Sequence, residues 1–441
     1  MLSLSLQTVV TAVACILLAI LLPKIVQNRY LSPLSKVPGP WLASITGQWL
    51  ILTDLAGNRT STIDELHRQY GPVVRIGPKE VSFSNPEVVK EIYGQQTQYP
   101  KSAAYDNMSL KPYGIFSMRD RAQHAQRRRL LSHAFSQAVL NDTEPTIDTF
   151  LKKLLNRVSK SFGKPVDMLL GFRLLSLDIV GELFLGQSFE ALDSRDPPAF
   201  LHWMDNNFIN MGIAGAFPLL HALLGFLPFA GARALSTAAE KIRSYGELKF
   251  NQYIKENGRQ SRRRDLLTKI INAQSETGER PLTDLETYTE VGNLVFAGTD
   301  TTSTTLTYLF WELAKHPEWQ EKLRNELLKA NQVKEKMVNI PQYRDIVDLP
   351  ILEAVMNESL RLHPAAPASL QRSTPTGGRT VNGFFIPEGT TVSMQSWTTQ
   401  RDSKAFPDPN RWDPERWLSP SKSADLERAK ELFMPFSKGP R

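Results

Sequence analysis

The stretch Ala297-Gly298-Thr299-Asp300-Thr301-Thr302 says most about the fold of this 441-residue chain. It lies inside Leu285–Leu313, a segment that is long and apolar enough to form a central helix. Residues 299–305 are threonine, aspartate and serine, which are poor helix formers. Poor helix formers inside a long buried helix often mark a functional site. The stretch therefore predicts a loosened, functional position in a central helix.

Several residues of this stretch suit a bound cofactor and the delivery of protons. Gly298 has no side chain, so a flat cofactor or ligand is expected to approach the backbone there. Thr301 lies four residues after Ala297, and its hydroxyl can bond that carbonyl and bend or open the helix. Asp300 adds a carboxyl beside the opening. The alternative is a polar helix face that contacts solvent.

A second group of charged residues follows downstream. Glu358 and Arg361 are three residues apart, so they lie on one helix face and can pair. Arg416, within Asp413-Pro414-Glu415-Arg416-Trp417, is expected to reach the same carboxylate. A carboxylate held by two guanidinium groups suits structural locking, because each guanidinium can bind in a bidentate manner.

Most of the remaining chain is helical in pattern. Helical spacing of apolar residues is found in Phe150–Val158, Leu174–Leu185 and Glu318–Ala330. Strand-like segments beside turn signals are few, and they are Val73–Ile76, Val81–Ser84, Thr380–Val381, Phe384–Ile386 and Thr390–Met394. The pattern predicts one mainly helical body with a small β part assembled from distant pieces.

The apolar segment Phe217–Ala232 has two interpretations. It is broken by Pro218, Gly225, Pro228 and Gly231. It is either a buried helix pair or a loop that dips into a membrane surface.

The N-terminus has the pattern of a membrane anchor. Leu2–Leu22 carries no charge and approaches the length that spans a bilayer as a helix. Positive residues follow Pro23 and none precedes the span, which places the rest of the chain on the cytoplasmic side. We expect a transmembrane anchor at 1–23, a basic and Pro-rich linker at 24–40 and the functional domain at 41–441. A cleaved signal peptide is the alternative.

Composition narrows the possible partners. The net charge is +7, but the basic runs are short and no nucleic-acid-binding signature is found, so nucleic acid is not an expected partner. A membrane surface or an acidic protein partner fits the charge better. The one cysteine, Cys15, cannot form an internal disulfide.

The order of these motifs resembles that of a cytochrome P-450, and the chain is most similar to fungal microsomal members. The motifs are an anchor, the elbow Pro38-Gly39-Pro40, Ala297–Thr302, Glu358-x-x-Arg361, Pro414–Trp417 and Phe436-x-x-Gly439-x-Arg441. The resemblance covers essentially the whole chain. It implies a mainly α fold with a small β subdomain, and the activity of a haem-thiolate monooxygenase.

The resemblance also implies roles for individual residues. Asp300 and Thr301 are similar to the acid–alcohol pair that assists dioxygen activation. Glu358, Arg361 and Arg416 match the structural triad of the family. The residues expected to bind haem are His124, Arg128, Ala297, Gly298, Arg372, Phe436, Gly439 and Arg441. His124, taken without the resemblance, is equally a surface histidine among arginines.

The family's iron ligand is a cysteine two residues after the position of Arg441, where this sequence ends. Cys15 lies in the predicted anchor and is not expected to reach haem, so no metal ligand is assigned. As written, the polypeptide is expected not to bind haem productively. An incomplete or fragmentary sequence, an inactive membrane-anchored relic and a non-catalytic membrane module are the three explanations.

The resemblance implies insertion of one oxygen atom of dioxygen into an apolar organic substrate, in fungal secondary metabolism. Electrons would come from an NADPH-dependent flavin reductase at the endoplasmic reticulum membrane, with the catalytic domain in the cytoplasm. The substrate would contact Ser102–Met118, Phe208–Phe229 and the central helix. Isomerisation or dehydration by a haem enzyme is a further alternative, against which the presence of both Asp300 and Thr301 argues.

Overall fold

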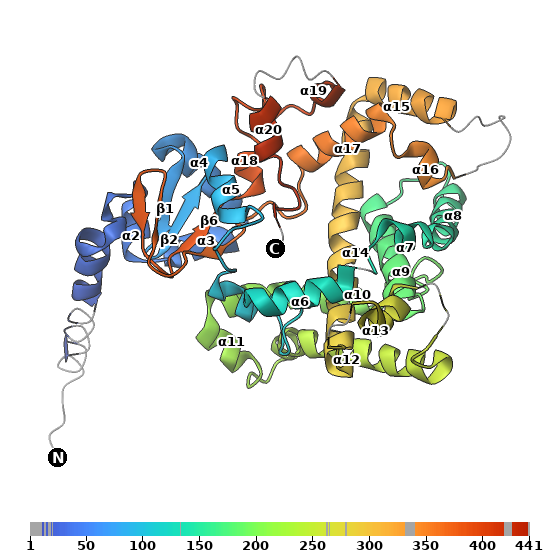
Figure 1. The fold of residues 1–441 in the computed structure, drawn as a ribbon, viewed down its shortest axis with the longest axis horizontal. Helices are drawn as coiled ribbons and strands as arrows, with labels where there is room; N and C mark the ends of the chain where they lie inside the picture. The colour runs from blue at the N-terminus through green and yellow to red at the C-terminus, as the bar shows by residue number, and fades with distance from the viewer. Residues whose placement is uncertain are drawn as a thin grey trace. The chain divides into compact units, whose positions relative to one another are not determined.

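The computed structural model describes residues 11, 12, 15, 19, 21–132, 134–261, 263, 265–277, 280–330, 340–418 and 426–439. The chain forms two compact units (Figure 1). Unit 1 combines Met1–Ser102, Ala366–Asn410 and Ser423–Arg441, and unit 2 combines Ala103–Ala365 and Arg411–Lys422. All described strands belong to unit 1, whereas the described elements of unit 2 are helices.

Unit 1 is built around a four-stranded sheet with the order β1-β2-β6-β3. Strands β1 (Val73–Gly77) and β2 (Glu80–Phe83) are antiparallel. Strand β2 pairs in parallel with β6 (Thr391–Ser393), which is antiparallel to β3 (Arg372–Ser373). The sheet therefore joins two distant parts of the sequence, and the prediction of a β part assembled from distant pieces is confirmed.

A separate hairpin in unit 1 follows a strong turn signal. It consists of β4 (Arg379–Val381) and β5 (Phe384–Ile386), which are antiparallel. Asn382 and Gly383 between them have positive φ angles of 47° and 80°. Two central residues with positive φ match the twist of the flanking strands, which explains why Asn-Gly predicted this hairpin correctly.

The helices of unit 1 are mostly short. They are η1 (Gln27–Leu31), η2 (Pro33–Lys36), α2 (Trp41–Ile45), α3 (Gln48–Leu55), α4 (Arg59–Tyr70), α5 (Pro86–Tyr93), α18 (Ser396–Thr399) and α20 (Leu426–Leu432). Leu50 of α3 and Ile63 of α4 pack with Val74 and Ile76 of β1. Every residue of β1 is buried, so both faces of this strand are covered.

Among the described residues, no helix is both long and apolar enough to cross a membrane. The predicted anchor at 1–23 falls largely outside the described residues.

Unit 2 contains the long helices that the sequence predicts. Its helices are η3 (Ala103–Asn107), α6 (Arg121–Ser132), α7 (Gln137–Asn141), α8 (Glu144–Lys160), α9 (Met168–Leu185), α10 (Ala199–Ala216), α11 (Pro218–Leu224), α12 (Ala230–Asn257), α13 (Leu266–Thr277), α14 (Asp284–Lys315), α15 (Pro317–Ala330), α16 (Tyr343–Ile346), α17 (Pro350–Leu362) and α19 (Glu415–Leu418). The predicted central helix is α14, which runs through this unit in Figure 1.

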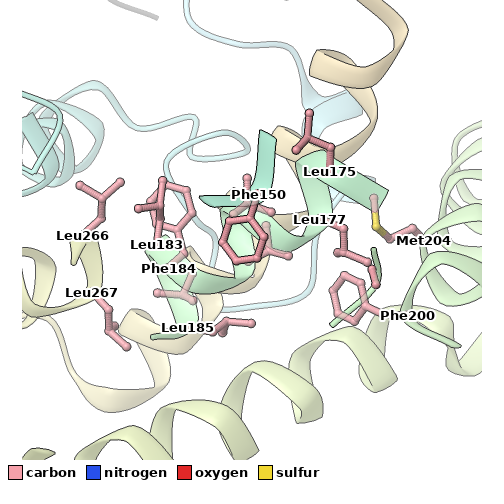
Figure 2. Packing of buried hydrophobic residues seen from close by; sticks show 14 of the residues in the cluster. Phe150, Leu175, Leu177, Leu183, Phe184, Leu185, Phe200, Met204, Leu266 and Leu267 are labelled. Atoms are coloured by element: carbon pink, nitrogen blue, oxygen red, sulfur yellow. The ribbon is translucent and has the colours of Figure 1, made fainter. Parts of the chain in front are cut away.

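The core of unit 2 forms around α9, which is apolar on almost every side. Figure 2 shows Leu177 and Leu185 of α9 among side chains from neighbouring helices, such as Phe150 of α8 and Phe200 of α10. Val291 and Val295 of α14 complete this cluster and are fully buried. One side of α14 packs against α9. Only the residues on its other sides can contact solvent, a ligand or another segment.

The apolar segment Phe217–Ala232 is mostly exposed, with only Leu224 and Ala232 buried, so its interpretation as a buried helix pair is wrong. It forms the short helix α11 and a turn before α12. Leu219 and Phe226 are 83% and 85% exposed. Phe229 is also exposed. The prolines and glycines interrupt the helix, and the apolar side chains lie on the surface of unit 2.

Candidate active site

Helix α14 carries the predicted catalytic stretch on a rigid support. A capping box starts the helix, because the Thr283 hydroxyl accepts from the backbone of Glu286 and Glu286 in turn accepts from the backbone of Thr283. Val291 and Val295 face the core, whereas Ala297 and Thr301 are exposed. Ala297 and Thr301 are four residues apart, so they form one accessible stripe along the helix.

The hydroxyl of Thr301 makes the predicted contact. Its Oγ1 donates to the carbonyl of Ala297 over 2.8 Å. Thr305 makes the same kind of bond to the carbonyl of Thr301 over 2.9 Å. The helix nevertheless runs without a break from Asp284 to Lys315, so these bonds do not open it. The hydroxyl is thus held at a fixed position on the exposed stripe.

The missing side chain of Gly298 makes room for α9. A Cβ at Gly298 would lie 2.8 Å from Cγ1 of Val180 in α9. This is closer than two carbon atoms can pack, so the glycine permits the close approach of α9 and α14. The expectation that a flat cofactor approaches the backbone at Gly298 stays a prediction.

Asp300 faces a partner that the sequence analysis did not find. Its Oδ1 accepts from Nε of Arg173 in α9 over 2.8 Å, and its Oδ2 lies 3.4 Å from Nη2. Arg173 also bonds Asp205 of α10 over 2.7 Å. Burial raises the pKa of the Asp300 carboxyl above its ordinary value, while the guanidinium of Arg173 acts in the opposite direction. A positively charged residue inside the apolar run Met168–Leu185 is the signal that could have found Arg173.

Helix α6 carries the predicted propionate-binding pair. His124 is 5% exposed, so it is not a surface histidine, whereas Arg128 is exposed. Arg127, which the sequence analysis did not single out, is buried and pairs with Glu286 and Glu290 of α14. The structure therefore ties α6 to α14 through the arginine next to the predicted one.

Glu358 has the contacts that the spacing predicts. Nε and Nη2 of Arg361 each donate to one of its oxygens over 2.8 Å. Arg416 Nε donates to Oε1 over 3.1 Å, and Trp417 Nε1 donates to Oε2 over 3.0 Å. Glu358 and Arg361 have side chains that are 0% exposed. This buried, fully bonded carboxylate ties α17 to the segment at α19, which suits a structural role.

Arg372, Phe436 and Gly439 belong to unit 1. Arg372 is buried in β3, and its guanidinium lies 5.0 Å from the ring centre of Tyr93. Phe436 is 82% exposed. Gly439 has a φ of +70°, and a Cβ there would collide with the backbone oxygen of Tyr93, so only glycine fits. Arg441 lies outside the described residues.

Comparisons with known proteins identify the family. The family model of cytochrome P450 matches residues 37–441. The chain belongs to the cytochrome P450 family.

Curated relatives agree with this assignment. The chain is 31% identical to the cytochrome P450 monooxygenase stcB of Emericella nidulans, over 94% of this chain and 79% of the relative. It is 33% identical to tryprostatin B 6-hydroxylase of Aspergillus fumigatus, over 92% of this chain and 70% of the relative. It is 31% identical to averantin hydroxylase of Aspergillus parasiticus, over 93% and 81%. The protein is by family a haem-dependent monooxygenase, and the comparisons give no support to the relic interpretation.

On α14, the residues of this cytochrome P450 fit one face of a haem group. The stripe of Ala297 and Thr301 combines a small side chain with a fixed hydroxyl, and its exposure leaves room for a flat group beside α14. Within the described part of the chain, no group of three or more His, Cys, Asp or Glu side chains could hold a metal ion. Cys15 is exposed. The chain contributes to the site the stripe on α14 and the groups that bond to it.

Proposed function

We propose that this cytochrome P450 inserts one oxygen atom of dioxygen into an apolar organic substrate of fungal secondary metabolism. The observation that carries the proposal is the exposed stripe of Ala297 and Thr301, with the half-buried Asp300 carboxyl next to it in the chain. Haem, when bound, supplies the iron at which dioxygen is activated. The chain then has to place the substrate and bring protons to the reacting oxygen.

Thr301 and Asp300 have the chemistry for this proton delivery. The Thr301 hydroxyl donates to Ala297, and its oxygen can accept a hydrogen bond at the same time. Asp300 keeps one oxygen firmly bonded to Arg173, whereas its Oδ2 has the longer contact of 3.4 Å. Because burial raises the pKa of Asp300, the carboxyl can take up and release a proton closer to neutral pH than an exposed aspartate can.

Aromatic side chains of unit 2 support an apolar, ring-bearing substrate. The ring centres of Phe208 in α10 and Phe296 in α14 are 4.6 Å apart. Phe296 directly precedes Ala297 of the stripe. Tyr105 and Phe116 of the segment 103–118 pack edge to face at 5.5 Å. The names of two relatives specify hydroxylation of averantin and of tryprostatin B. From the aromatic side chains of unit 2, we propose an apolar substrate that carries rings.

Thr301→Ala tests the proposed role of the hydroxyl. In the haem-loaded enzyme, the variant is expected to consume dioxygen and NADPH while forming less product, by about tenfold or more, because general acid–base groups contribute about 100- to 10000-fold. The measurement is the ratio of product formed to oxygen consumed.

Thr305→Ala is the matched control for Thr301→Ala. Thr305 makes the same back-bond one turn later, so its loss changes the helix in the same manner without removing the hydroxyl at 301. An unchanged ratio of product to oxygen in Thr301→Ala, or an equal loss in both variants, contradicts the proposed role.

We also propose that the enzyme is held at the endoplasmic reticulum membrane by residues 1–23, with its catalytic part in the cytoplasm. An NADPH-dependent flavin reductase in the same membrane would supply electrons. The exposed apolar side chains of α11 and of the turn that follows it support membrane contact by a second segment.

A further inference from the structure

A buried carboxylate in α14 holds two other parts of unit 2. Glu290 is 0% exposed. Its Oε1 accepts from Nη1 of Arg127 in α6 over 2.5 Å. Its two oxygens also accept from the backbone N–H of Ile115, over 2.9 and 3.1 Å. One side chain therefore connects α14, α6 and the segment Ala103–Met118.

The charge of Glu290 is compensated within the same cluster. Arg127 donates to Glu286 over 2.7 Å as well, and Glu286 accepts from Arg280 over 2.9 Å. Burial raises the pKa of Glu290, while Arg127 and the Ile115 N–H act in the opposite direction. Two carboxylates and two guanidinium groups thus form a paired network, which is the condition for keeping charge away from water.

The backbone next to Ile115 lies directly against α14. A Cβ at Gly114 would collide with Nδ2 of Asn293 and lie 3.0 Å from Oε2 of Glu290. A glycine lets the segment come this close without displacing either side chain. The contact with Glu290 is made by the main-chain N–H of Ile115.

The position of Glu290 along α14 connects this contact to the active stripe. Glu290 precedes Ala297 by seven residues and Thr301 by eleven, so all three point to the same side of the helix. At Glu290 this side is covered by the segment Ala103–Met118, whereas at Ala297 and Thr301 it is exposed. The segment therefore ends the accessible stripe on its N-terminal side.

We propose that Glu290 is a positioning residue, whose carboxylate fixes the main chain of Ala103–Met118 on α14 and so sets where the accessible part of the Ala297–Thr301 stripe begins. The inference rests on the proposed function, because that function assigns this segment to the substrate. Glu290 itself touches neither the stripe nor a reacting group.

Two variants of equal size separate the hydrogen bond from simple packing. Glu290→Gln keeps an oxygen that can accept from the Ile115 N–H, whereas Glu290→Met fills the same space and has no such acceptor. Hydrogen–deuterium exchange of the full chain is the measurement, and it requires neither haem nor substrate. In Glu290→Met, exchange of the Ile115 amide and of peptides from 103–118 is expected to be about ten- to a hundredfold faster, because a hydrogen bond to a charged group is lost. Glu290→Gln is expected to restore most of this protection.

Glu286→Gln is the matched control, because it removes the other carboxylate partner of Arg127 and leaves the Ile115 contact intact. It is expected to leave exchange of 103–118 near the wild-type rate. Equal exchange of the Ile115 amide in the Gln and Met variants overturns the proposal. Acceleration spread evenly over α9 and α14 also overturns it, since that result shows a general loss of stability. Failure of the Thr301→Ala test would leave these exchange rates unaffected, so the two proposals fail separately.

Discussion

Asp300 is a carboxyl group whose charge in the folded protein depends on Arg173. Burial raises its pKa above the value in the unfolded chain, and Arg173 counteracts this effect. The folded state therefore binds the proton more tightly, so the stability that the neutral carboxyl contributes is fully present below the unfolded pKa and is lost as the pH rises through the folded pKa. The loss amounts to about 1.4 kcal/mol for each unit by which the two pKa values differ.

Arg173→Met is expected to raise the pKa of Asp300 further, because it removes the group that favours the ionised carboxylate. The free energy of unfolding should then fall more steeply with rising pH, and the fall should extend to higher pH than in the wild type. Urea unfolding at a series of pH values above about pH 4, the ordinary range of aspartate, measures this. The double variant Arg173→Met/Asp300→Asn has no carboxyl at 300 and should lose the added pH dependence. If the double variant keeps it, another group is responsible.

At the same scale, the pairs that Glu358 makes with Arg361 and Arg416 were predictable, whereas the long-range pairs of Arg173 and Arg127 were not. Glu358 and Arg361 lie three residues apart, so their pairing follows from helix geometry alone. Arg173 and Asp300 are 127 residues apart, and Arg127 and Glu290 are 163 apart. Apolar periodicity shows which side of a helix is buried, but it does not show which buried charge of another helix lies opposite.

Among the elements, the close packing of α9 against α14 depends on the absence of a side chain at Gly298. Gly298→Ala is expected to destabilise the protein by about 1–3 kcal/mol, because the added methyl group overlaps Val180 Cγ1. Val180→Ala removes that atom, so the double variant should lose less stability than the sum of the two single variants. Chemical denaturation of the protein without haem measures this coupling.

The outcome for the protein without haem separates two roles of Gly298. If the glycine served mainly to let a cofactor approach, Gly298→Ala would stabilise the haem-free protein through higher helix propensity, by up to about 1 kcal/mol. Such a result would contradict the packing role. The sequence located the glycine in the central helix but did not predict its contact with Val180, because a helical pattern does not show which neighbour lies above a given residue.

Sequence patterns also predicted where helices and strands lie along the chain better than they predicted what surrounds them in the fold. The central helix, the hairpin at Asn382-Gly383 and the strands at 73–84 and 391–393 all formed where turn signals and periodicity placed them. The segment Phe217–Ala232 had two open interpretations, because an apolar run is equally compatible with a core and with an apolar surface. Only the folded arrangement showed that Leu219 and Phe226 are exposed.

For the whole molecule, the exposed apolar side chains around α11 are expected to enter a membrane surface. Transferring one such side chain from water to an apolar environment is worth about 1.5–3 kcal/mol, so several exposed ones together favour contact. In a full-length Cys15→Ser background, a fluorophore on Phe226→Cys should be quenched by nitroxide-labelled lipids in phosphatidylcholine vesicles. The same fluorophore on Phe162→Cys is the control, since Phe162 is 95% exposed and follows α8, which lies far from α11 within unit 2 (Figure 1). Quenching only at position 226 supports a second membrane contact, whereas no quenching or equal quenching at both positions shows that α11 does not contact the lipid specifically.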